Sequence, residues 1–476
     1  MIFNSFQFIW LFPLIFIIYW AAEHFQRNRW RKLPQYFLLL ISYGLYFQWN
    51  PAYCLILFYV TLVTFFGAKI IHKRQDSEKK NQKFLIIIGV VLTLVPLLVF
   101  KYYNFITQAG ASVLQYIGID TAPPGLNWVV PLGLSFYTFQ ALGYLWDIYY
   151  KKIKPEKNFG NYMLFVAFFP QILCGPISKA TDLLPQIDQP KRFDYNRAVT
   201  GLKLILWGMF LKVVLADRLG IYVDTVYNNY GHYSGTTCLL TAIFYSFQIY
   251  GDFAGYSYMA VGVAKLLGFE LIYNFQRPYF ATSVSQFWKR WNISLTKWLT
   301  SYIYIPLGGS RNGKFRTYLN ILITFLVSGI WHGANYTFIL WGGIHGVAQC
   351  IEKFFGLNKK QINRRLTIPR MLITFCIVTL AWIYFRMPSI EAASEVIKRI
   401  FTNFGSLFVD QETLIYIGLA FLILLPIELL LEYKNLQFKR FLYNHAILRW
   451  TGYISLTIII LLFGVLDSSQ FIYVNF

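Results

Sequence analysis

Long apolar stretches separated by short polar connections run through almost the whole chain. A helix needs about 20 apolar residues to cross the roughly 30 Å hydrocarbon layer of a membrane. Several stretches are shorter than that, as half-helices and re-entrant segments are. The pattern therefore predicts an all-α polytopic membrane protein with about eleven to thirteen membrane segments. We expect the segments at residues 6–22, 35–49, 51–68, 84–100, 129–149, 159–177, 199–217, 236–264, 319–331, 335–350, 369–385, 413–431 and 450–466.

The composition supports this fold class. Hydrophobic residues make up 57% of the 476 residues and charged residues 13%, and the mean hydropathy is +0.46. Soluble domains carry about 25% charged residues. Disordered chains, coiled coils and small disulfide scaffolds are excluded. Residues 1–476 are expected to form a single integral membrane domain, since no polar stretch is long enough to fold alone.

The net charge of +22 comes from 43 basic and 21 acidic residues. The basic residues gather in short runs at 23–33, 69–83 and 151–157, and two segments separate each run from the next. Cytoplasmic loops carry such an excess, so we predict the lipid bilayer, and no nucleic acid, as a partner. The N-terminus and the Trp49–Pro51 turn are then outside. Beyond residue 178 the pattern does not determine the orientation.

Neither cysteine nor histidine shows metal-ligand spacing. The five cysteines lie mostly in or beside apolar stretches, and their odd number argues against a disulfide framework. The chain contains no HExxH motif and no paired-histidine spacing. No metal is predicted.

Residues 277–346 are the unusual part of the chain. If 286–299 is a helix, its aromatic and leucine side chains form one stripe and its basic side chains stay off that stripe. This pattern predicts an amphipathic helix at the membrane interface. The basic residues either extend to the interface or contact a polyanionic donor such as coenzyme A. The stripe is Phe287, Trp291, Leu295 and Trp298, and the basic residues are Lys289, Arg290 and Lys297.

A glycine-rich stretch from Pro306 to Lys314 predicts tight turns, without the spacing of a phosphate-binding loop. An apolar run then ends at His332. Histidine inside a membrane segment is costly and by default functional. Its imidazole can take a proton from a hydroxyl or thiol, although it can also simply bond a helix carbonyl. Gly329 and Gly333 are expected to leave room for a substrate.

His345 follows His332 by 13 residues. On one straight helix that separation is about 20 Å. The two histidines cannot then share a site unless the helix breaks between them. A structural role is expected for His345.

At these residues the sequence resembles the membrane-bound O-acyltransferase superfamily. It is most similar to the bacterial branch that O-acetylates alginate, peptidoglycan and other envelope polysaccharides. The resemblance follows the chain in order and rests on many short motifs. They lie at 135–140 (SFYTFQ), 174–177 (CGPI), 250–257 (YGDFAGYS), 277–280 (RPYF), 286–299, 304–311, 328–335 and 382–386 (WIYFR).

The resemblance implies a multi-helix fold around a central funnel or tunnel, with 277–346 as the catalytic core segment. His332 stands at the position of the family histidine and would be the general base. Asn292 stands at the second polar position, where the branch has histidine and other members have Asn or Asp. It would position a reacting group. Tyr258 stands where the branch usually has Asp. Lys289, Arg290 and Arg311 would hold the phosphates of the donor.

The C-terminal residues 471–476 (FIYVNF) are similar to the terminal Phe-x-Tyr-x-x-Phe pattern of envelope acylation systems. Tyr473 would then carry the acyl group transiently, since a phenol ester remains an activated acyl donor. An aromatic anchor in the interface is the alternative.

The function that the resemblance implies is transfer of an acetyl group from cytoplasmic acetyl-CoA towards hydroxyls of an exported cell-envelope or extracellular polysaccharide. Acetyl-CoA would be a substrate, with no permanently bound cofactor. A separate extracytoplasmic acetyltransferase partner is expected, and the location would be the bacterial cytoplasmic (inner) membrane. A transporter or flippase for an envelope precursor, and an inactive scaffold that binds such a partner, are the alternatives.

Overall fold

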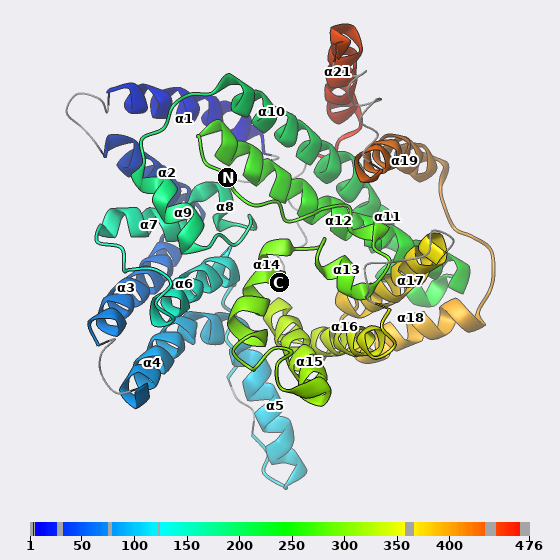
Figure 1. Cartoon of the computed structure of the whole chain (residues 1–476). Coiled ribbons are helices and arrows are strands. Elements are labelled where there is room, and N and C mark those ends of the chain that lie inside the picture. The colour runs from blue at the N-terminus through cyan, green and yellow to red at the C-terminus, as the bar shows by residue number, and fades with distance from the viewer. Residues whose placement is uncertain are drawn as a thin grey trace.

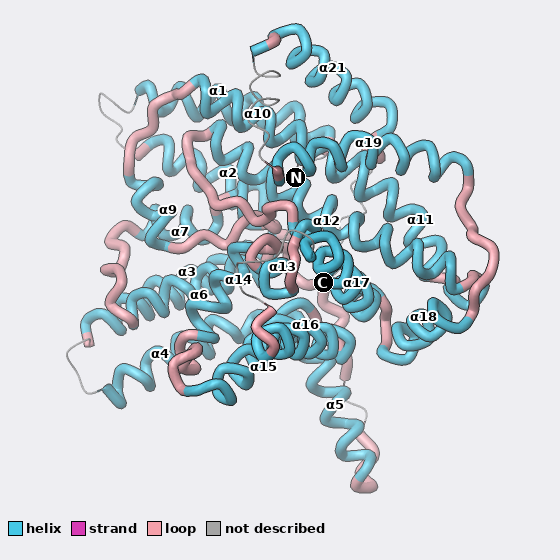
Figure 2. The backbone as a smooth tube through the Cα atoms, turned by 45° about the vertical axis from the view of Figure 1, so that its right-hand side comes forward, coloured by secondary structure: helices cyan, strands magenta, loops and turns pink. Residues whose placement is uncertain are grey.

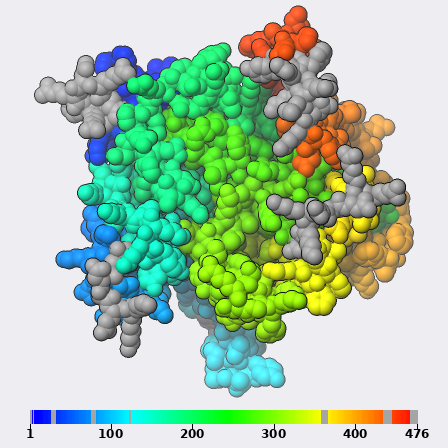
Figure 3. Space-filling model, viewed as in Figure 1, coloured from blue at the N-terminus to red at the C-terminus, as the bar shows by residue number. Residues whose placement is uncertain are grey.

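In the computed structural model, helices and their connections make up the described residues, which contain no strand. The structure describes residues 3, 5–25, 32–74, 79–121, 124–357, 366–433 and 444–466. Figure 1 shows the helices gathered into one body, with α5 projecting from one edge and α21 at the opposite edge. The space-filling view in Figure 3 shows the same projection of α5.

The first half of the chain contributes ten helices to the described part of the fold. They are α1 (Phe6–Phe25), α2 (Leu33–Trp49), α3 (Pro51–Lys73), α4 (Lys79–Leu97), α5 (Tyr103–Tyr116), α6 (Leu134–Tyr149), α7 (Phe159–Ala167), α8 (Phe169–Ile172), α9 (Ala180–Asp188) and α10 (Tyr195–Met209). A π-helical turn, Leu98–Tyr102, joins α4 to α5.

The second half contains the longest helix and the site. Its helices are α11 (Asp217–Tyr227), α12 (Gly235–Leu266), α13 (Val284–Trp288), α14 (Ile293–Leu299), α15 (Gly313–His332), α16 (Tyr336–Phe354), α17 (Thr367–Arg386), α18 (Ile390–Thr402), α19 (Gln411–Glu432) and α21 (Ala446–Phe463). Two further π-helical segments are Phe210–Ala216 and Thr300–Tyr304. In the tube view of Figure 2, short α13 and α14 lie among the longer helices.

The predicted fold class is confirmed. Every predicted membrane segment overlaps one or more of these helices. Among the described residues, 7 helical stretches are long and apolar enough to cross a membrane. The other predicted segments are shorter or less apolar helices, or are buried inside the body, as α12 is.

Glycines let α10 approach α12 closely. A Cβ atom added to Gly208 would lie 2.5 Å from the carbonyl oxygen of Gly255, and one added to Gly255 would lie 2.7 Å from that of Gly208. Gly201 and Gly262 form a second pair, seven residues before Gly208 in α10 and seven residues after Gly255 in α12, with distances of 2.7 and 2.6 Å. Small residues at such spacing allow the backbones of membrane helices to approach each other closely.

A buried ion cluster joins the same two parts of the chain. Lys212, in the π-helical segment after α10, lies 2.5 Å from Asp217 and 2.7 Å from Asp252 of α12. All three side chains are at most 2% exposed. Charges in such surroundings are stabilised only by close partners, so the cluster pins α10 and α11 to the middle of α12.

The prediction of one amphipathic helix over 286–299 is wrong. Its stripe is buried inside the protein, the chain breaks between α13 and α14, and Asn292 has left-handed backbone angles (φ 41°, ψ 56°). Backbone bonds to a neighbouring loop replace the missing helical ones: Gln276 N donates to the Arg290 carbonyl, and Ile293 N to the Asn274 carbonyl. The tertiary bonds outweigh the helical periodicity.

An ion cluster also holds this broken segment in place. Arg290 donates two hydrogen bonds of 2.9 Å to the carboxylate of Glu432, at the end of α19. Arg277 donates a third bond, of 2.8 Å, to the same carboxylate. Bidentate pairs between Arg and carboxylate are among the stronger charge-assisted bonds. Residues 277–292 are therefore clamped to α19.

The Lys212 cluster generates a stability prediction. Lys212→Met leaves Asp217 and Asp252 buried without their common cation, so the free energy of unfolding should fall by about 3–5 kcal/mol. The measurement is the melting temperature of the detergent-solubilised protein. Lys152→Met is the matched control: Lys152 pairs with Asp147 at 3.0 Å, but its side chain is 45% exposed, and its loss should cost at most about 1 kcal/mol. Equal melting temperatures for the two variants would contradict the proposed stabilisation by the Lys212 cluster.

Candidate active site

His332 is the last residue of α15 and is 4% exposed. Aromatic rings surround its imidazole, with centroid distances of 4.8 Å to Trp331, 5.0 Å to Trp341 and 5.1 Å to Phe385. These rings come from α15, α16 and α17. The histidine is therefore held by apolar contacts on several sides, inside the body of the protein.

The helix breaks immediately after His332, at residues 333–335, and the chain returns as α16. As a result, His345 and His332 both contact Trp341, each at a centroid distance of 5.0 Å. The helix therefore does break between the two histidines, which is the condition under which they could share a site. Among the described residues, neither ring nitrogen of His345 has a hydrogen-bond partner.

The glycines beside His332 serve packing rather than substrate access, contrary to expectation. A Cβ atom on Gly329 would lie 2.2 Å from the carbonyl oxygen of Phe338, and one on Gly333 would lie 2.1 Å from the Phe338 ring. Both contacts are with α16. The space that these glycines leave is already filled by the returning helix.

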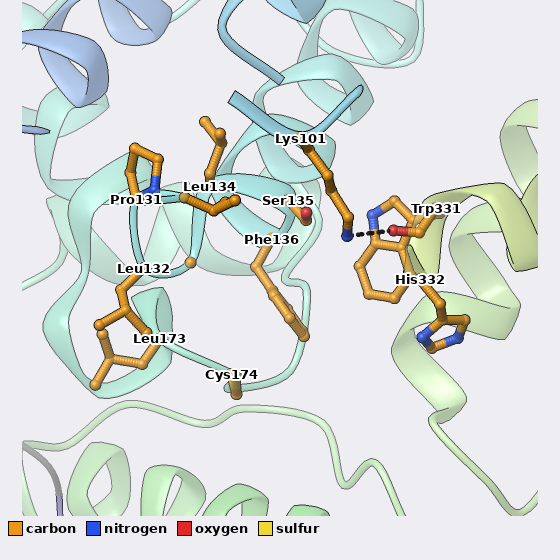
Figure 4. A pocket seen from close by; sticks show the side chains of 12 residues that line it. Lys101, Pro131, Leu132, Leu134, Ser135, Phe136, Leu173, Cys174, Trp331 and His332 are labelled. Atoms are coloured by element: carbon orange, nitrogen blue, oxygen red, sulfur yellow. Dashed lines mark hydrogen bonds between the residues drawn. The ribbon is translucent and has the colours of Figure 1, made fainter. Parts of the chain in front are cut away.

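His332 lines a small cavity of about 30 Å³, which is room for one or two water-sized groups. Figure 4 shows Lys101 and Trp331 on one wall, and Phe136 and Cys174 on the opposite side. The loop that leads into α6 completes the lining. The lining residues are Lys101, Val130, Pro131, Leu132, Gly133, Leu134, Ser135, Phe136, Leu173, Cys174, Trp331 and His332.

Lys101 and Tyr102 bond the end of α15. The Lys101 ammonium donates to the Trp331 carbonyl at 2.7 Å, and the Tyr102 hydroxyl donates to the Ile330 carbonyl at 2.6 Å. The last carbonyls of a helix have no partners within the helix and carry its negative dipole end. These two side chains supply donors there and so fix the position of the neighbouring His332.

Asn292 is 1% exposed, and neither its amide oxygen nor its amide nitrogen has a hydrogen-bond partner among the described residues. The adjacent Trp291 ring lies 5.0 Å from that of Trp382, which lies 5.6 Å from Trp341. Trp341 in turn contacts His332. The broken segment that carries Asn292 is thus linked to His332 through a continuous set of packed rings.

Ser294 ties the CGPI motif to the same segment. Ile177 N donates to the Ser294 hydroxyl at 3.0 Å, and Ser294 N donates to the side-chain oxygen of Asn274 at 3.0 Å. Tyr258, where the resemblance expects Asp, donates to the Phe275 carbonyl at 3.2 Å. The CGPI motif therefore contacts the broken segment that carries Asn292.

A larger cavity, of about 380 Å³, follows α15 on its way to His332. Ile321, Thr324, Phe325 and Ser328 of α15 line it, and Ser328 is four residues before His332. The ammonium-bearing residues Lys289 and Lys353 also belong to its lining. The other lining residues are Ser285, Trp288, Leu295, Thr296, Leu299, Thr300, Tyr304 and Gln349.

A third cavity, of about 240 Å³, lies on the other face of α14. Ser294, Lys297 and Trp298 of α14 line it, together with residues of α9 such as Asp182. His332 is not among its lining residues. It is therefore separate from the two cavities along α15.

The predicted donor-binding residues lie in different surroundings. Lys289 is exposed and lines the larger cavity. Arg290 is held by Glu432, and Arg311 is exposed in the turn before α15. Tyr473 and the tail 471–476 lie outside the described residues. The roles of all four residues and of the tail remain predictions.

Lys101 was missed by the sequence analysis, although its position offered an indication. It follows the apolar run 84–100 directly, and an ionisable residue within a membrane stretch is by default functional. Among the described residues, no group of three His, Cys, Asp or Glu side chains could hold a metal ion.

Comparison with known proteins identifies several relatives. A probable alginate O-acetylase from Pseudomonas aeruginosa is 34% identical over 407 residues, which cover 85% of this chain and 76% of that protein. A peptidoglycan O-acetyltransferase from Helicobacter pylori is 32% identical over 428 residues, covering 84% and 79%. A teichoic acid D-alanyltransferase from Bacillus subtilis is 25% identical over 324 residues, covering 65% and 79%.

The sequence profile of the membrane-bound O-acyltransferase family matches residues 150–389. This range contains both Asn292 and His332. The first two relatives exceed 30% identity over most of both sequences. The chain therefore belongs to the membrane-bound O-acyltransferase family and is a multi-pass membrane O-acyltransferase.

Proposed function

We propose that this protein transfers an acetyl group from cytoplasmic acetyl-CoA towards hydroxyls of an exported cell-envelope or extracellular polysaccharide. The observation that carries the proposal is the arrangement of two cavities in series along α15. The larger cavity reaches Ser328, and the small cavity contains His332, one helical turn further on. In this proposal, a donor in the larger cavity and an acceptor in the small cavity approach the same histidine from opposite ends.

The charges around α15 suit a donor that arrives from the cytoplasm. Arg311, Lys314 and Arg316 stand at the beginning of α15, and a basic helix end favours the cytoplasmic side. Lys289 and Lys353 line the cavity that follows, where ammonium groups can hold the phosphates of coenzyme A. Because Arg290 is already bonded to Glu432, these lysines are the better candidates.

The small cavity suits the acceptor side. Residues 130–136 of its lining come directly after the connection between the predicted segments 84–100 and 129–149. The pattern of basic residues predicts that this connection lies outside. Lys101 is 22 positions beyond Lys79, the first residue of α4, so it lies roughly 33 Å along a helical path from the basic loop. That distance is close to the thickness of the hydrocarbon layer.

The reaction needs few groups. His332 takes the proton of the acceptor hydroxyl, and the oxygen forms a bond to the thioester carbonyl carbon, so that a tetrahedral oxyanion forms. Its collapse breaks the carbon–sulfur bond and re-forms the carbonyl. The proton on His332 goes to the leaving thiolate. Asn292 can donate and accept hydrogen bonds, which suits it to orienting the thioester carbonyl.

The names of two relatives support an acetyl group and a polysaccharide: one is an alginate O-acetylase and one a peptidoglycan O-acetyltransferase. The family assignment favours an enzyme over a transporter or flippase. A bacterial cytoplasmic (inner) membrane location and an extracytoplasmic acetyltransferase partner belong to this proposal.

His332→Ala should lower the rate of coenzyme A release from acetyl-CoA by about 10²–10⁴-fold, because the general base is lost. The measurement uses purified full-length protein in detergent, with glycerol as the acceptor alcohol, and follows the free thiol. His232→Ala is the control, since His232 is exposed in a short turn away from both cavities. Undiminished release by folded His332→Ala protein would overturn the proposed function.

Asn292→Gly should lower the same rate by about 10- to 100-fold without lowering the melting temperature. Glycine adopts the left-handed backbone angles of residue 292 at no steric cost, so only the amide is removed. Asn292→Ala also loses the amide but strains the backbone, and it should be less stable than the glycine variant. Full activity of Asn292→Gly would exclude a role for the amide.

Tyr473→Phe tests the proposed acyl relay. With labelled acetyl-CoA and no added acceptor, wild-type protein should acquire label on Tyr473, and Tyr473→Phe should acquire none there. Peptide mapping locates the label. Equal labelling of both proteins would favour the role of residues 471–476 as an interfacial anchor.

A further inference from the structure

We propose that Lys101 stabilises the oxyanion that forms when the acceptor hydroxyl attacks the thioester. The inference rests on the proposed function. It assigns a catalytic role to a residue that belongs to none of the sequence motifs above and comes from a different part of the fold than His332 and Asn292.

The position of Lys101 carries the argument. Its side chain lines the same 30 Å³ cavity as His332. Figure 4 shows the ammonium reaching from the α4–α5 connection towards the end of α15, where it bonds the Trp331 carbonyl. A cavity of this size can hold a carbonyl oxygen or a hydroxyl.

The ammonium also has capacity to spare. A lysine ammonium carries three N–H donors, and one of them serves the Trp331 carbonyl. Among the described residues, no carboxylate oxygen lies within 4.0 Å of this nitrogen. Lys101 is partly buried, and a charge that is taken out of water without a counter-charge is costly. A negative charge that develops in the cavity would offset that cost.

Helix capping alone does not require a charge. Tyr102 bonds the preceding carbonyl of α15 through a neutral hydroxyl, at a similar distance of 2.6 Å. A neutral donor at position 101 could serve the Trp331 carbonyl in the same way. The helix dipole favours a cation at this helix end, and the ammonium of Lys101 at the same time faces the cavity of the candidate base.

In the proposed step, the acceptor oxygen bonds to the carbonyl carbon, and the electron pair of the carbonyl moves onto its oxygen. One N–H of Lys101 donates to that oxygen, while the Trp331 carbonyl keeps the ammonium in place. The electron pair returns as the carbon–sulfur bond breaks. Lys101 stays protonated throughout, and His332 carries the proton from the hydroxyl to the thiolate.

The test measures coenzyme A release from acetyl-CoA, with glycerol as acceptor, in purified full-length variants. Lys101→Gln keeps an N–H donor and removes the charge. It should lower kcat by about 10- to 100-fold, because a neutral donor stabilises an oxyanion less than a charged one does, and change the KM for acetyl-CoA by less than about threefold. Lys101→Arg keeps the charge and should retain at least about ten times the kcat of Lys101→Gln.

Tyr102→Phe is the matched structural control, because it removes the neighbouring bond to α15 and no charge. Its kcat should stay within about fivefold of wild type. Melting temperatures of all variants are measured together. A Lys101→Gln protein that keeps more than about a third of wild-type kcat would refute the inference. So would equal losses of kcat and stability in Lys101→Gln and Tyr102→Phe, or an effect on KM alone.

The two proposals can fail separately. If wild type releases coenzyme A and His332→Ala does not, the proposed function stands whatever the Lys101 variants show. If wild type shows no release that depends on His332, the proposed function is overturned together with this inference.

Discussion

A helix that ends inside a protein leaves its last carbonyl groups away from water and without partners in the helix, and the site of this protein depends on how that problem is solved. A buried backbone group that lacks a hydrogen-bond partner costs about 1–3 kcal/mol. At the end of α15, Lys101 and Tyr102 bond two of these carbonyls from another part of the chain. The break at 333–335 can therefore lie inside the protein. It places His332 at the end of a helix, where it lines the small cavity.

The packing around this break explains why glycines and large aromatic residues stand next to it. Gly329 and Gly333 allow α16 to return directly against α15, with Phe338 occupying the space that a Cβ atom would need. Trp341 then lies between His332 and His345. Aromatic rings give contact area at little cost in side-chain freedom, so a histidine surrounded by them keeps one position. Rigid packing thus helps to fix the orientation of the His332 imidazole.

Much of this could be predicted from the sequence, and the remainder depends on contacts between distant residues. The apolar stretches predicted the positions of the helices, because a membrane helix forms its backbone hydrogen bonds within its own segment. His332 was predicted because a histidine in an apolar run is unusual. The break before Asn292 was not, since the stripe from Phe287 to Trp298 continues at helical spacing. Asn274 creates that break, through bonds that no local pattern reveals.

The left-handed backbone at residue 292 also bears on why this chain has asparagine there. A positive φ is uncommon outside glycine, and Asn, Asp and His are the residues enriched at it. The resemblance implies the same three residues at this position: His in the polysaccharide branch, and Asn or Asp elsewhere in the superfamily. The backbone geometry thus limits the choice before chemistry does. Asparagine in place of histidine fits the fold without strain, and what it changes is only the hydrogen-bonding and proton-transfer capacity of a buried polar group.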